Sequence, residues 1–593
     1  PYCVMINTEK LNRISPIKVL GQPGEKGCAK IHVEAGVITQ DIMDFASDQG
    51  WVFATDPTSA WACTIGGNIA ENAGGKKAVF YGTALDNLIS YEMVMPSGKS
   101  IRVKRQDHPL RKILPQDQVV FEICDDSDHV IERIELKGTD IRKPGLGKDV
   151  TNKALMGLPG IQKEGCDGII TGATFVLYPK FRHKKTFCIE FFGDDMAEAS
   201  QVIADVVDSF SLTDPALMAL EHFDEEYIKA IDYKTKTLVG NRLKAVLLVD
   251  MVSNDHTSLQ QGIERIETIL DGFEKTGLSV ACDESESKRY WQDRKRLGAI
   301  ASHTNAFKLN EDIVLPIRAL ADFARYVDQY NIMEKRYTQE TIIKQIVQYL
   351  DQAIPMDDPQ WLESKVSQAK DLAFTTLEKL EIASRDAVEA WIHPKNFFNQ
   401  VMDSLRGYQM VSEQVKQIYE RVKSRLIVIA THMHAGDGNV HVNIPVLSND
   451  REMMARAAAT ADDVMAKAVE FNGVVSGEHG IGVTKAKHLD PLRLDELNTY
   501  RSEIDPKGLM NPEKLRDPGI MNRMFTPSFN LLKLEASILK HGALEDLASD
   551  IANCVRCGRC KPQCPVFFPA KNMFFHPRNK NLAVAALIEA LLY

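Results

Sequence analysis

Four cysteines near the C-terminal end constrain this chain more than any other feature. They follow the spacing C-x2-C-x2-C-x3-C and are followed by a proline: Cys554, Cys557, Cys560, Cys564 and Pro565. Thiolates at this spacing hold a [4Fe–4S] cluster, and the fourth cysteine ligates a second cluster in proteins that carry two. A zinc site or a disulfide pair is the alternative, but zinc sites usually divide their cysteines between two distant pairs. The run therefore predicts an iron–sulfur segment and an electron carrier.

The two ends of the sequence read as incomplete. A second cysteine run of this kind is absent from the 593 residues, so a further cluster ligand is expected beyond Tyr593. The first residues have the pattern of the interior of a strand, and they include neither an initiator Met nor a signal peptide. We therefore expect the chain to be a piece of a longer protein.

Length and charge limit the class of protein. A chain of 593 residues suggests roughly three to five domain-sized units. The net charge of −10 and the pI of about 5.9 disfavour nucleic-acid binding. Seven further cysteines are scattered without a disulfide pattern, which favours a reducing cytoplasm. No stretch reaches the roughly 18 apolar residues that a membrane-spanning helix needs, so any membrane contact is expected to be peripheral, on the inner face.

Pattern changes divide the chain into three parts, and the fold class is predicted as α+β. Residues 1–180 contain short β-rich runs between glycine turns. Residues 181–517 mix strands and amphipathic helices, with a helical insertion at 338–425. We expect this insertion to cap its parent domain rather than to form an interaction arm. Residues 518–593 carry the cysteine run and form the expected helical, ferredoxin-like segment.

A glycine-rich stretch at residues 64–75 suits a flat or phosphorylated ligand. It holds four glycines and two asparagines, Asn68 and Asn72. Glycines let the backbone approach a ligand closely and leave its N–H groups able to donate. A purely structural turn accounts for the pattern about as well. The stretch is not G-x-G-x-x-G, so a Rossmann dinucleotide site is not implied.

Three histidines surround a predicted hairpin turn. Asp437 and Gly438 form a preferred two-residue turn after an apolar strand. That turn would place His434 opposite His441, with Cβ atoms roughly 4.5–5.5 Å apart, and His432 opposite Asn443. Two imidazoles at this separation can bind one ion, and Zn²⁺, Mn²⁺ and Fe²⁺ are the suitable ones, with Zn²⁺ favoured. A surface hairpin with incidental histidines is the alternative.

The sequence Ser-Gly-Glu-His-Gly-Ile-Gly at residues 476–482 supplies a carboxylate and a further histidine. Glu478 offers an oxygen ligand that completes a set of two histidines and one carboxylate. His479 points the other way if the backbone is extended, and a histidine suits proton abstraction from a hydroxyl near neutral pH. A core histidine at a glycine turn is the alternative.

Together with the glycine-rich stretch 64–75, the short motifs at residues 56–58, 81–82, 86–87, 96–98 and 168–171 resemble the FAD domain of the vanillyl-alcohol-oxidase-type (PCMH-type) flavoproteins. More narrowly they resemble the branch that holds D-lactate, glycolate and D-2-hydroxyglutarate dehydrogenases. Two departures stand out: the family's first, pyrophosphate-binding loop would precede residue 1, and the segment 157–168 is longer than usual. The resemblance implies FAD contacts from these residues: Pro57, Thr58, Ile65, Gly66, Gly67, Asn68, Asn72, Gly75, Tyr81, Gly82, Gly168, Ile169, Ile170 and Asn511.

The later motifs resemble the C-terminal substrate domain of the same family. The resemblance implies His434, His441 and Glu478 as ligands of a divalent metal, Asn443 as a substrate contact and His479 as the catalytic base.

Two basic residues gain a role only from this resemblance. Arg294, within the stretch 290–294, matches the family's carboxylate-clamping arginine, and its planar fork suits that task. Lys308, within 305–316, matches a second carboxylate contact. Without the resemblance, both residues read as solvated charges.

The combined expectation is an FAD enzyme that oxidises a D-2-hydroxy acid, D-lactate or D-2-hydroxyglutarate, to the 2-oxo acid. The flavin would take the hydride, and electrons would leave through the [4Fe–4S] cluster to a quinone or an electron-transfer protein. Glycolate is an alternative substrate. An electron-relay subunit without its own substrate is the alternative from another class, although such a subunit would be expected to lose the histidines. The sequence leaves a homo-oligomer open.

Overall fold

The structure is a computed structural model that describes most of the first 516 residues. The described residues are 4, 6–20, 27–193, 196–210, 213–237, 239, 242–295, 307–352, 359–447 and 450–516, with isolated residues between 543 and 587. Cys554 and Cys557 lie outside them, whereas Cys560 is exposed and Cys564 is partly buried. The iron–sulfur segment therefore stays a prediction.

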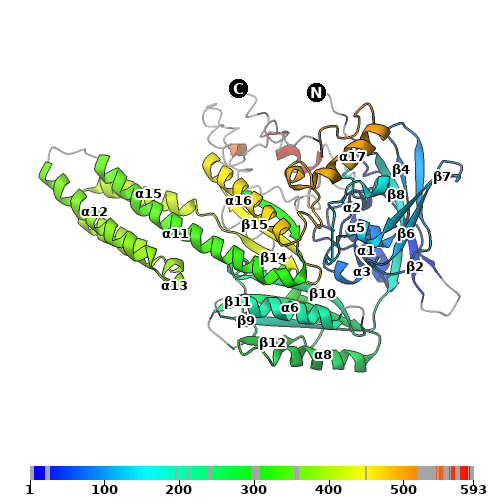
Figure 1. Ribbon diagram of the computed structural model, residues 1–593, viewed down its shortest axis with the longest axis horizontal. Helices are drawn as coiled ribbons and strands as arrows, with labels where there is room; N and C mark the ends of the chain where they lie inside the picture. The colour runs from blue at the N-terminus through cyan, green and yellow to red at the C-terminus, as the bar shows by residue number, and fades with distance from the viewer. Residues whose placement is uncertain are drawn as a thin grey trace.

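The N-terminal part is built on an antiparallel sheet of eight strands (Figure 1), in the order β1-β2-β8-β4-β5-β6-β7 with β3 beside β8. Alternate residues of β2 are buried, as its sequence predicts. The strands are β1 (Lys18–Val19), β2 (Ala29–Glu34), β3 (Trp51–Phe53), β4 (Leu88–Val94), β5 (Ser100–Arg105), β6 (Gln118–Cys124), β7 (Val130–Lys137) and β8 (Ile169–Pro179). The helices are α1 (Thr39–Asp48), α2 (Ile65–Glu71), α3 (Ala78–Tyr81), α4 (Ala84–Asn87) and α5 (Gly138–Ile141).

A second antiparallel sheet of seven strands follows, in the order β12-β9-β11-β10-β14-β15-β13. Its strands are β9 (His183–Phe192), β10 (Ala216–Asp224), β11 (Leu243–Ser253), β12 (Thr276–Val280), β13 (Phe307–Val314), β14 (Ala430–His434) and β15 (Asn439–Val446). One face packs in a large apolar core against α6 (Ala197–Phe210), α8 (His256–Leu270), α11 (Leu320–Gln352) and α16 (Arg451–Glu470).

The other face of the second sheet carries α7 (Glu225–Ala230) and α9 (Glu284–Lys295). Where β10 begins, residues of both sheets share a small apolar core that contains Tyr81, Tyr178, Ala216 and Met218. The described chain then continues through α17 (Pro491–Ile504). Among the described residues, none of the helices combines the length and the apolar character needed to cross a membrane.

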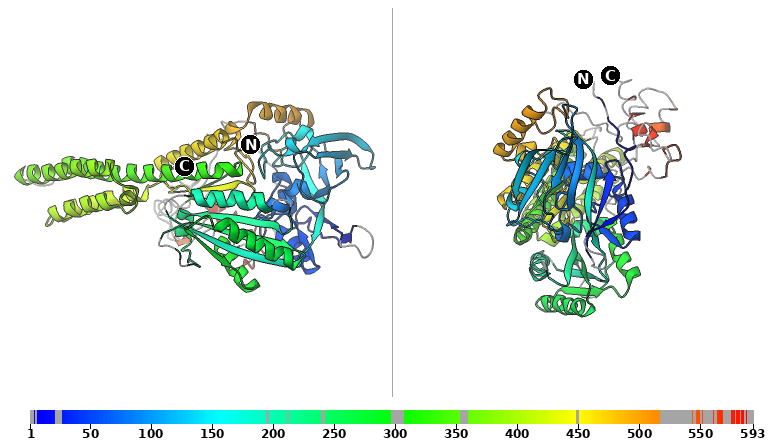
Figure 2. Two further views of the ribbon diagram at one scale, coloured as in Figure 1. Left: turned by 60° about the horizontal axis from the view of Figure 1, so that its bottom comes forward. Right: turned by 90° about the vertical axis from the view of Figure 1, so that its right-hand side faces the viewer.

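The helical insertion is an arm, and the expectation of a cap is wrong. Figures 1 and 2 show α11 leaving the sheet and projecting away from it together with α12 (Pro359–Glu381) and α15 (Gln409–Ser424). These helices, with α13 (Arg385–Glu389) and α14 (Ile392–Ser404), bury their apolar faces against one another in a separate core. A cap would need those faces on the sheet. The helical region also starts earlier than expected, because α11 runs unbroken from Leu320.

Replacing Phe397 with Ala should destabilise this arm, because its ring is fully buried in the separate core. We expect a loss of about 3–5 kcal/mol in the free energy of unfolding, measured by urea denaturation followed by circular dichroism. Phe374, which is 66% exposed on α12, is the matched control, and its replacement by Ala should change little. Equal midpoints for the two variants would contradict the separate core.

Candidate functional site

The histidines of the hairpin gather on the face of the second sheet that lies opposite the large apolar core. Alternation along the strands sends Met433, Val440 and Val442 into that core, as the sequence predicts. His434 and His441 therefore share the other face, where their ring centroids are 5.1 Å apart. His432 stacks on His441 at 4.6 Å.

The register of the hairpin differs from the prediction. β14 ends at His434 and β15 begins at Asn439, so four residues form the loop rather than two. His432 is in register with His441, and His434 with Asn439, which corrects the predicted pairings of His434 with His441 and of His432 with Asn443.

Contacts from elsewhere in the chain hold this wider loop. The Asp437 carboxylate lies 3.0 Å from Lys148 Nζ, and Leu315 N–H donates to the Gly438 carbonyl. The shift equals two residues, which is the side-chain period of a strand. The histidines therefore keep the predicted face.

Glu478 completes a compact donor set with the two histidines. One carboxylate oxygen, Oε1, lies 3.4 Å from His434 Nε2, and the other, Oε2, lies 3.7 Å from His441 Nε2. One donor atom from each of the three residues fits within a 4.8 Å span. Ligand atoms around a tetrahedral ion with bonds of about 2.1 Å are about 3.4 Å apart. The three residues named by the sequence therefore fit one divalent cation.

Opposite charges are paired at the donor set. Burial by itself lowers the pKa of His434, but the carboxylates of Glu221 and Glu478 raise it to about 9. Burial by itself raises the pKa of Glu478, but Lys148 and His434 hold it well below its usual range. The two carboxylates thus favour the charged form of His434, and Lys148 and His434 favour the charged form of Glu478.

Two residues that the sequence analysis missed hold the donor set in place. Glu221 on β10 lies with Oε1 2.5 Å from His434 Nδ1. Burial by itself raises the pKa of Glu221, but Arg294 and His434 lower it to about 2, so it is ionised. Lys148 from the first domain donates to Glu478 Oε1 at 2.5 Å. The signal for Glu221 was a charged residue directly after the apolar run at residues 216–220 of β10.

His479 lies next to His441, with ring centroids 5.0 Å apart, and its side chain is 33% exposed. Its Nδ1 is 3.7 Å from the buried carboxylate of Asp312 on β13. The same carboxylate accepts hydrogen bonds from the backbone N–H groups of Gly477 and Glu478 at 2.7 Å and from Lys485 at 2.8 Å. Asp312 thus holds the loop and orients the imidazole.

Arg294 reaches the site from α9. Its Nε donates to Glu221 Oε2 at 2.5 Å, and its Nη1 donates to Thr58 Oγ1 at 2.8 Å. Its Nη2 lies 3.3 Å from His434 Nδ1. A guanidinium has five N–H groups. The bonds to Glu221 and Thr58 use two of them, so Nη1 and Nη2 each keep at least one N–H group that these two bonds do not use.

The other two predicted substrate contacts lie on β13 and β15. Asn443 is fully buried on the histidine face, and its Nδ2 is 3.3 Å from His432 Nδ1. Lys308 is in register with Pro445. Its side chain lies outside the described part of the structure.

The glycine-rich loop reaches the same site. Gly66 and Gly67 lie in the first turn of α2, and Ile65 begins that helix. At the end of the loop, Gly75 N–H donates to Glu478 Oε1 at 2.8 Å. Gly75 has a φ of +130°, and a Cβ there would meet the Asp56 carbonyl at 2.3 Å, so only glycine fits this close approach.

The asparagines of this loop bond within the protein. Asn68 Nδ2 donates to Thr39 Oγ1 at 2.7 Å. Asn72 Nδ2 donates to Gln162 at 2.7 Å, while its Oδ1 accepts from Leu85 N–H at 2.8 Å. Their amide groups therefore shape the loop.

The remaining expected flavin residues are spread over the first domain. Tyr81 belongs to the apolar core between the sheets, and Gly82, with a φ of +76°, follows it. Gly168 precedes β8, which begins with Ile169 and Ile170, and Asn511 Nδ2 donates to the Gly165 carbonyl at 2.9 Å. Pro57 lies beside Thr58, the residue that Arg294 contacts.

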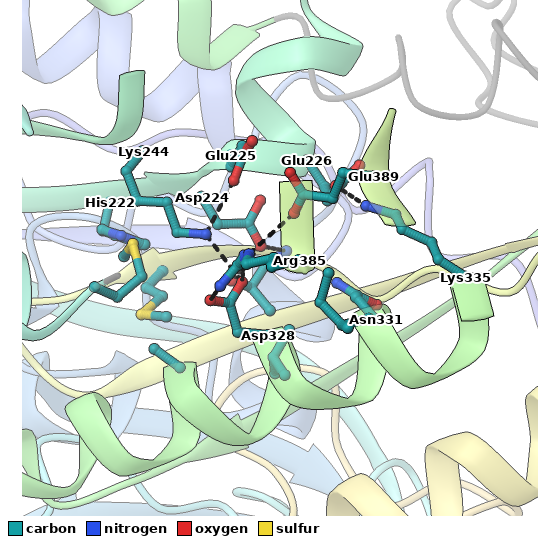
Figure 3. A pocket seen from close by; sticks show the side chains of 16 residues that line it. His222, Asp224, Glu225, Glu226, Lys244, Asp328, Asn331, Lys335, Arg385 and Glu389 are labelled. Atoms are coloured by element: carbon teal, nitrogen blue, oxygen red, sulfur yellow. Dashed lines mark hydrogen bonds and ion pairs between the residues drawn. The ribbon is translucent and has the colours of Figure 1, made fainter. Parts of the chain in front are cut away.

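A polar pocket lies on the opposite face of the second sheet (Figure 3), where His222 and Lys244 are among its lining residues. Lys244 pairs with Glu225 and Asp328 at 2.9 Å each, and Arg385 of the arm pairs with Asp328 at 2.6 Å. Its lining includes none of the expected site residues. These ion pairs join β11 to the end of the arm that lies next to the sheet, at Asp328 on α11 and Arg385 on α13.

Two family profiles match the chain. The profile described as "FAD binding domain" matches residues 2–104. The profile described as "FAD linked oxidases, C-terminal domain" matches residues 183–339 and 385–515. The gap between the last two ranges lies within the helical arm.

Named relatives align with most of the chain. Glycolate oxidase subunit GlcD of Bacillus subtilis is 24% identical over 82% of this chain and 74% of its own length. A D-lactate dehydrogenase of Anaerostipes hadrus is 24% identical over 86% of this chain and 80% of its own length. Among solved structures, substrate-bound p-cresol methylhydroxylase aligns with 87% of this chain and 80% of its own at 11% identity and a TM-score of 0.46, too low to indicate a shared fold by itself.

Asp312→Asn should destabilise the loop that carries Glu478 and His479. The change removes the nearer of the two carboxylates that pair with the buried Lys485, so we expect a loss of about 3 kcal/mol in unfolding free energy, measured by chemical denaturation. Asp128→Asn is the control, because this aspartate pairs with Arg102 and Lys104 on the surface and should matter little. A stable Asp312 variant would contradict the proposed anchor.

Proposed function

Because this chain belongs to the FAD-linked oxidase family, we propose that it oxidises a D-2-hydroxy acid to the corresponding 2-oxo acid. The main support is the meeting of His434, His441 and Glu478 with Arg294 and His479 at one place. The relatives named D-lactate dehydrogenase and glycolate oxidase support a small 2-hydroxy acid, and they support D-lactate and glycolate equally.

His434, His441 and Glu478 would hold a divalent metal, with Zn²⁺ favoured over Mn²⁺ or Fe²⁺. When bound, such an ion would act as a Lewis acid that lowers the pKa of a hydroxyl, and FAD would supply the hydride-accepting redox chemistry. The chain's own residues have two tasks: to orient the acid and to move the hydroxyl proton.

Arg294 would orient the substrate through its carboxylate. Its Nε is held by Glu221, so its two terminal nitrogens form the fork that a carboxylate accepts. Asn443 and Lys308 are proposed as further substrate contacts. His479 would take the hydroxyl proton at Nε2, the ring nitrogen that does not face Asp312.

We also propose that electrons leave the flavin through a [4Fe–4S] cluster on Cys554, Cys557, Cys560 and Cys564, toward a quinone or an electron-transfer protein. Iron and acid-labile sulfide analysis of the purified chain tests this step. A protein with bound FAD and neither element would exclude it.

An electron-relay subunit without its own substrate is the second candidate. The predicted metal ligands, the base and the arginine are all retained and adjacent, which favours an enzyme. D-2-Hydroxyglutarate, D-lactate and glycolate share the carboxylate and the α-hydroxyl that these residues would recognise.

His479→Ala should lower kcat by about 10²–10⁴-fold, because a general base acts on the proton in the transition state. FAD and metal contents should stay at the wild-type level, since His479 is proposed to bind neither. The measurement is the rate of flavin reduction after anaerobic mixing with substrate. His488→Ala is the control, because His488 pairs with Asp462 outside the donor set. If kcat falls by less than about tenfold, His479 is not the general base.

His434→Ala should abolish metal binding and oxidation together, because it removes one of only three proposed ligands. Elemental analysis of the purified protein checks the first effect. Chelation should inactivate the wild type, and added metal should restore it. His129→Ala, at an 81% exposed side chain, should keep both metal and activity. One equivalent of metal retained in the His434 variant would refute the site.

A further inference from the structure

A single carboxylate joins two parts of the proposed site. Glu221 lies in the middle of β10, fully buried, and is in direct register with His434 on β14. Cross-strand partners present their side chains on one face. That face carries the histidines, whereas the pocket of Figure 3 includes His222 on the opposite face.

The two oxygens of Glu221 have different partners. Oε1 lies 2.5 Å from His434 Nδ1, and Oε2 accepts from Arg294 Nε at 2.5 Å. Arg294 comes from α9, while His434 comes from the hairpin 213 residues after Glu221. The carboxylate thus connects three separate segments of the chain.

Each bond determines which atoms face the site. With Nδ1 tied to Glu221, His434 presents Nε2 toward Glu478, 3.4 Å away. A carboxylate on the far nitrogen of a metal-binding histidine fixes its ring orientation and raises its basicity. With Nε tied to the same carboxylate, Arg294 places Nη1 at 2.8 Å from Thr58 Oγ1 and Nη2 at 3.3 Å from His434 Nδ1.

We infer that Glu221 is the positioning residue that holds the metal ligand His434 and the substrate clamp Arg294 in one fixed relation. This inference rests on the proposed function and adds to it a residue that touches neither the metal nor the substrate. Glu221 would then set the distance between His434 and Arg294.

Glu190 provides a matched control on the same sheet. It is also a fully buried glutamate, on β9, and it accepts hydrogen bonds from Tyr233 Oη at 2.9 Å and from the backbone of Lys236 and Thr237 at 2.7 and 2.8 Å. Glu190→Gln therefore removes a buried charge without touching Arg294 or His434.

The test compares Glu221→Gln with Glu190→Gln. The first readout is Zn²⁺ affinity, measured by competition with a chromophoric chelator at a fixed FAD-to-protein ratio. Glu221→Gln should bind Zn²⁺ about 10–100-fold more weakly, and Glu190→Gln should match the wild type. The second readout, at saturating metal, is KM against kcat for the hydroxy acid. Glu221→Gln should raise KM more than it lowers kcat, because Arg294 loses its anchor.

Glu221→Asp serves as a second variant if Glu221→Gln does not fold with FAD. It keeps the charge but withdraws the carboxylate by one methylene, so weaker Zn²⁺ binding is again expected. Wild-type Zn²⁺ affinity in the folded Glu221 variants, with or without a loss of thermal stability, would overturn the inference while leaving the proposed function intact. A wild-type protein that binds no metal and oxidises no 2-hydroxy acid would overturn both.

Discussion

A buried lysine from the first domain pairs with a carboxylate of the second, and the geometry of the candidate site depends on this contact. Lys148 Nζ has three oxygen neighbours: Glu478 Oε1 at 2.5 Å, Asp437 Oδ2 at 3.0 Å and the Gly75 carbonyl at 3.2 Å. Burying an ammonium is costly unless its N–H groups and its charge are all satisfied. The two domains supply these partners only when the glycine-rich loop, the hairpin and the Glu478 loop come together.

The two faces of the second sheet have separate tasks, and β10 shows how alternation divides them. Glu221 points to the histidines, whereas its neighbour His222 lines the polar pocket at the root of the arm. One face thus carries the proposed chemistry, and the other anchors the arm through Lys244, Asp328 and Arg385. Residues 340–384 of this arm fall outside the family match.

Sequence patterns predicted local features well and long-range ones poorly. The alternation of β2 and the core-facing Val440 and Val442 follow from short-range periodicity. The grouping of His434 and His441 with Glu478 was expected from the resemblance of their motifs to a known family. The predicted hairpin register was wrong because Asp437 pairs with Lys148, which is far away in sequence, and this contact stabilises a four-residue loop. Glu221 and Lys148 were missed for a related reason: their partners are 213 and 330 residues away, and no local pattern encodes such pairs. The arm was mistaken for a cap because an amphipathic pattern does not say which surface covers the apolar face.

Anaerobic titration of the FAD-loaded protein with 2-hydroxy acids tests the central claim most directly. We predict that at least one of D-lactate, D-2-hydroxyglutarate and glycolate bleaches the visible absorption band of the oxidised flavin within a single turnover. L-Lactate, the control of opposite configuration, should leave the band unchanged. An intact band with all of these acids, in protein with full FAD and metal content, would contradict the account and favour a relay subunit.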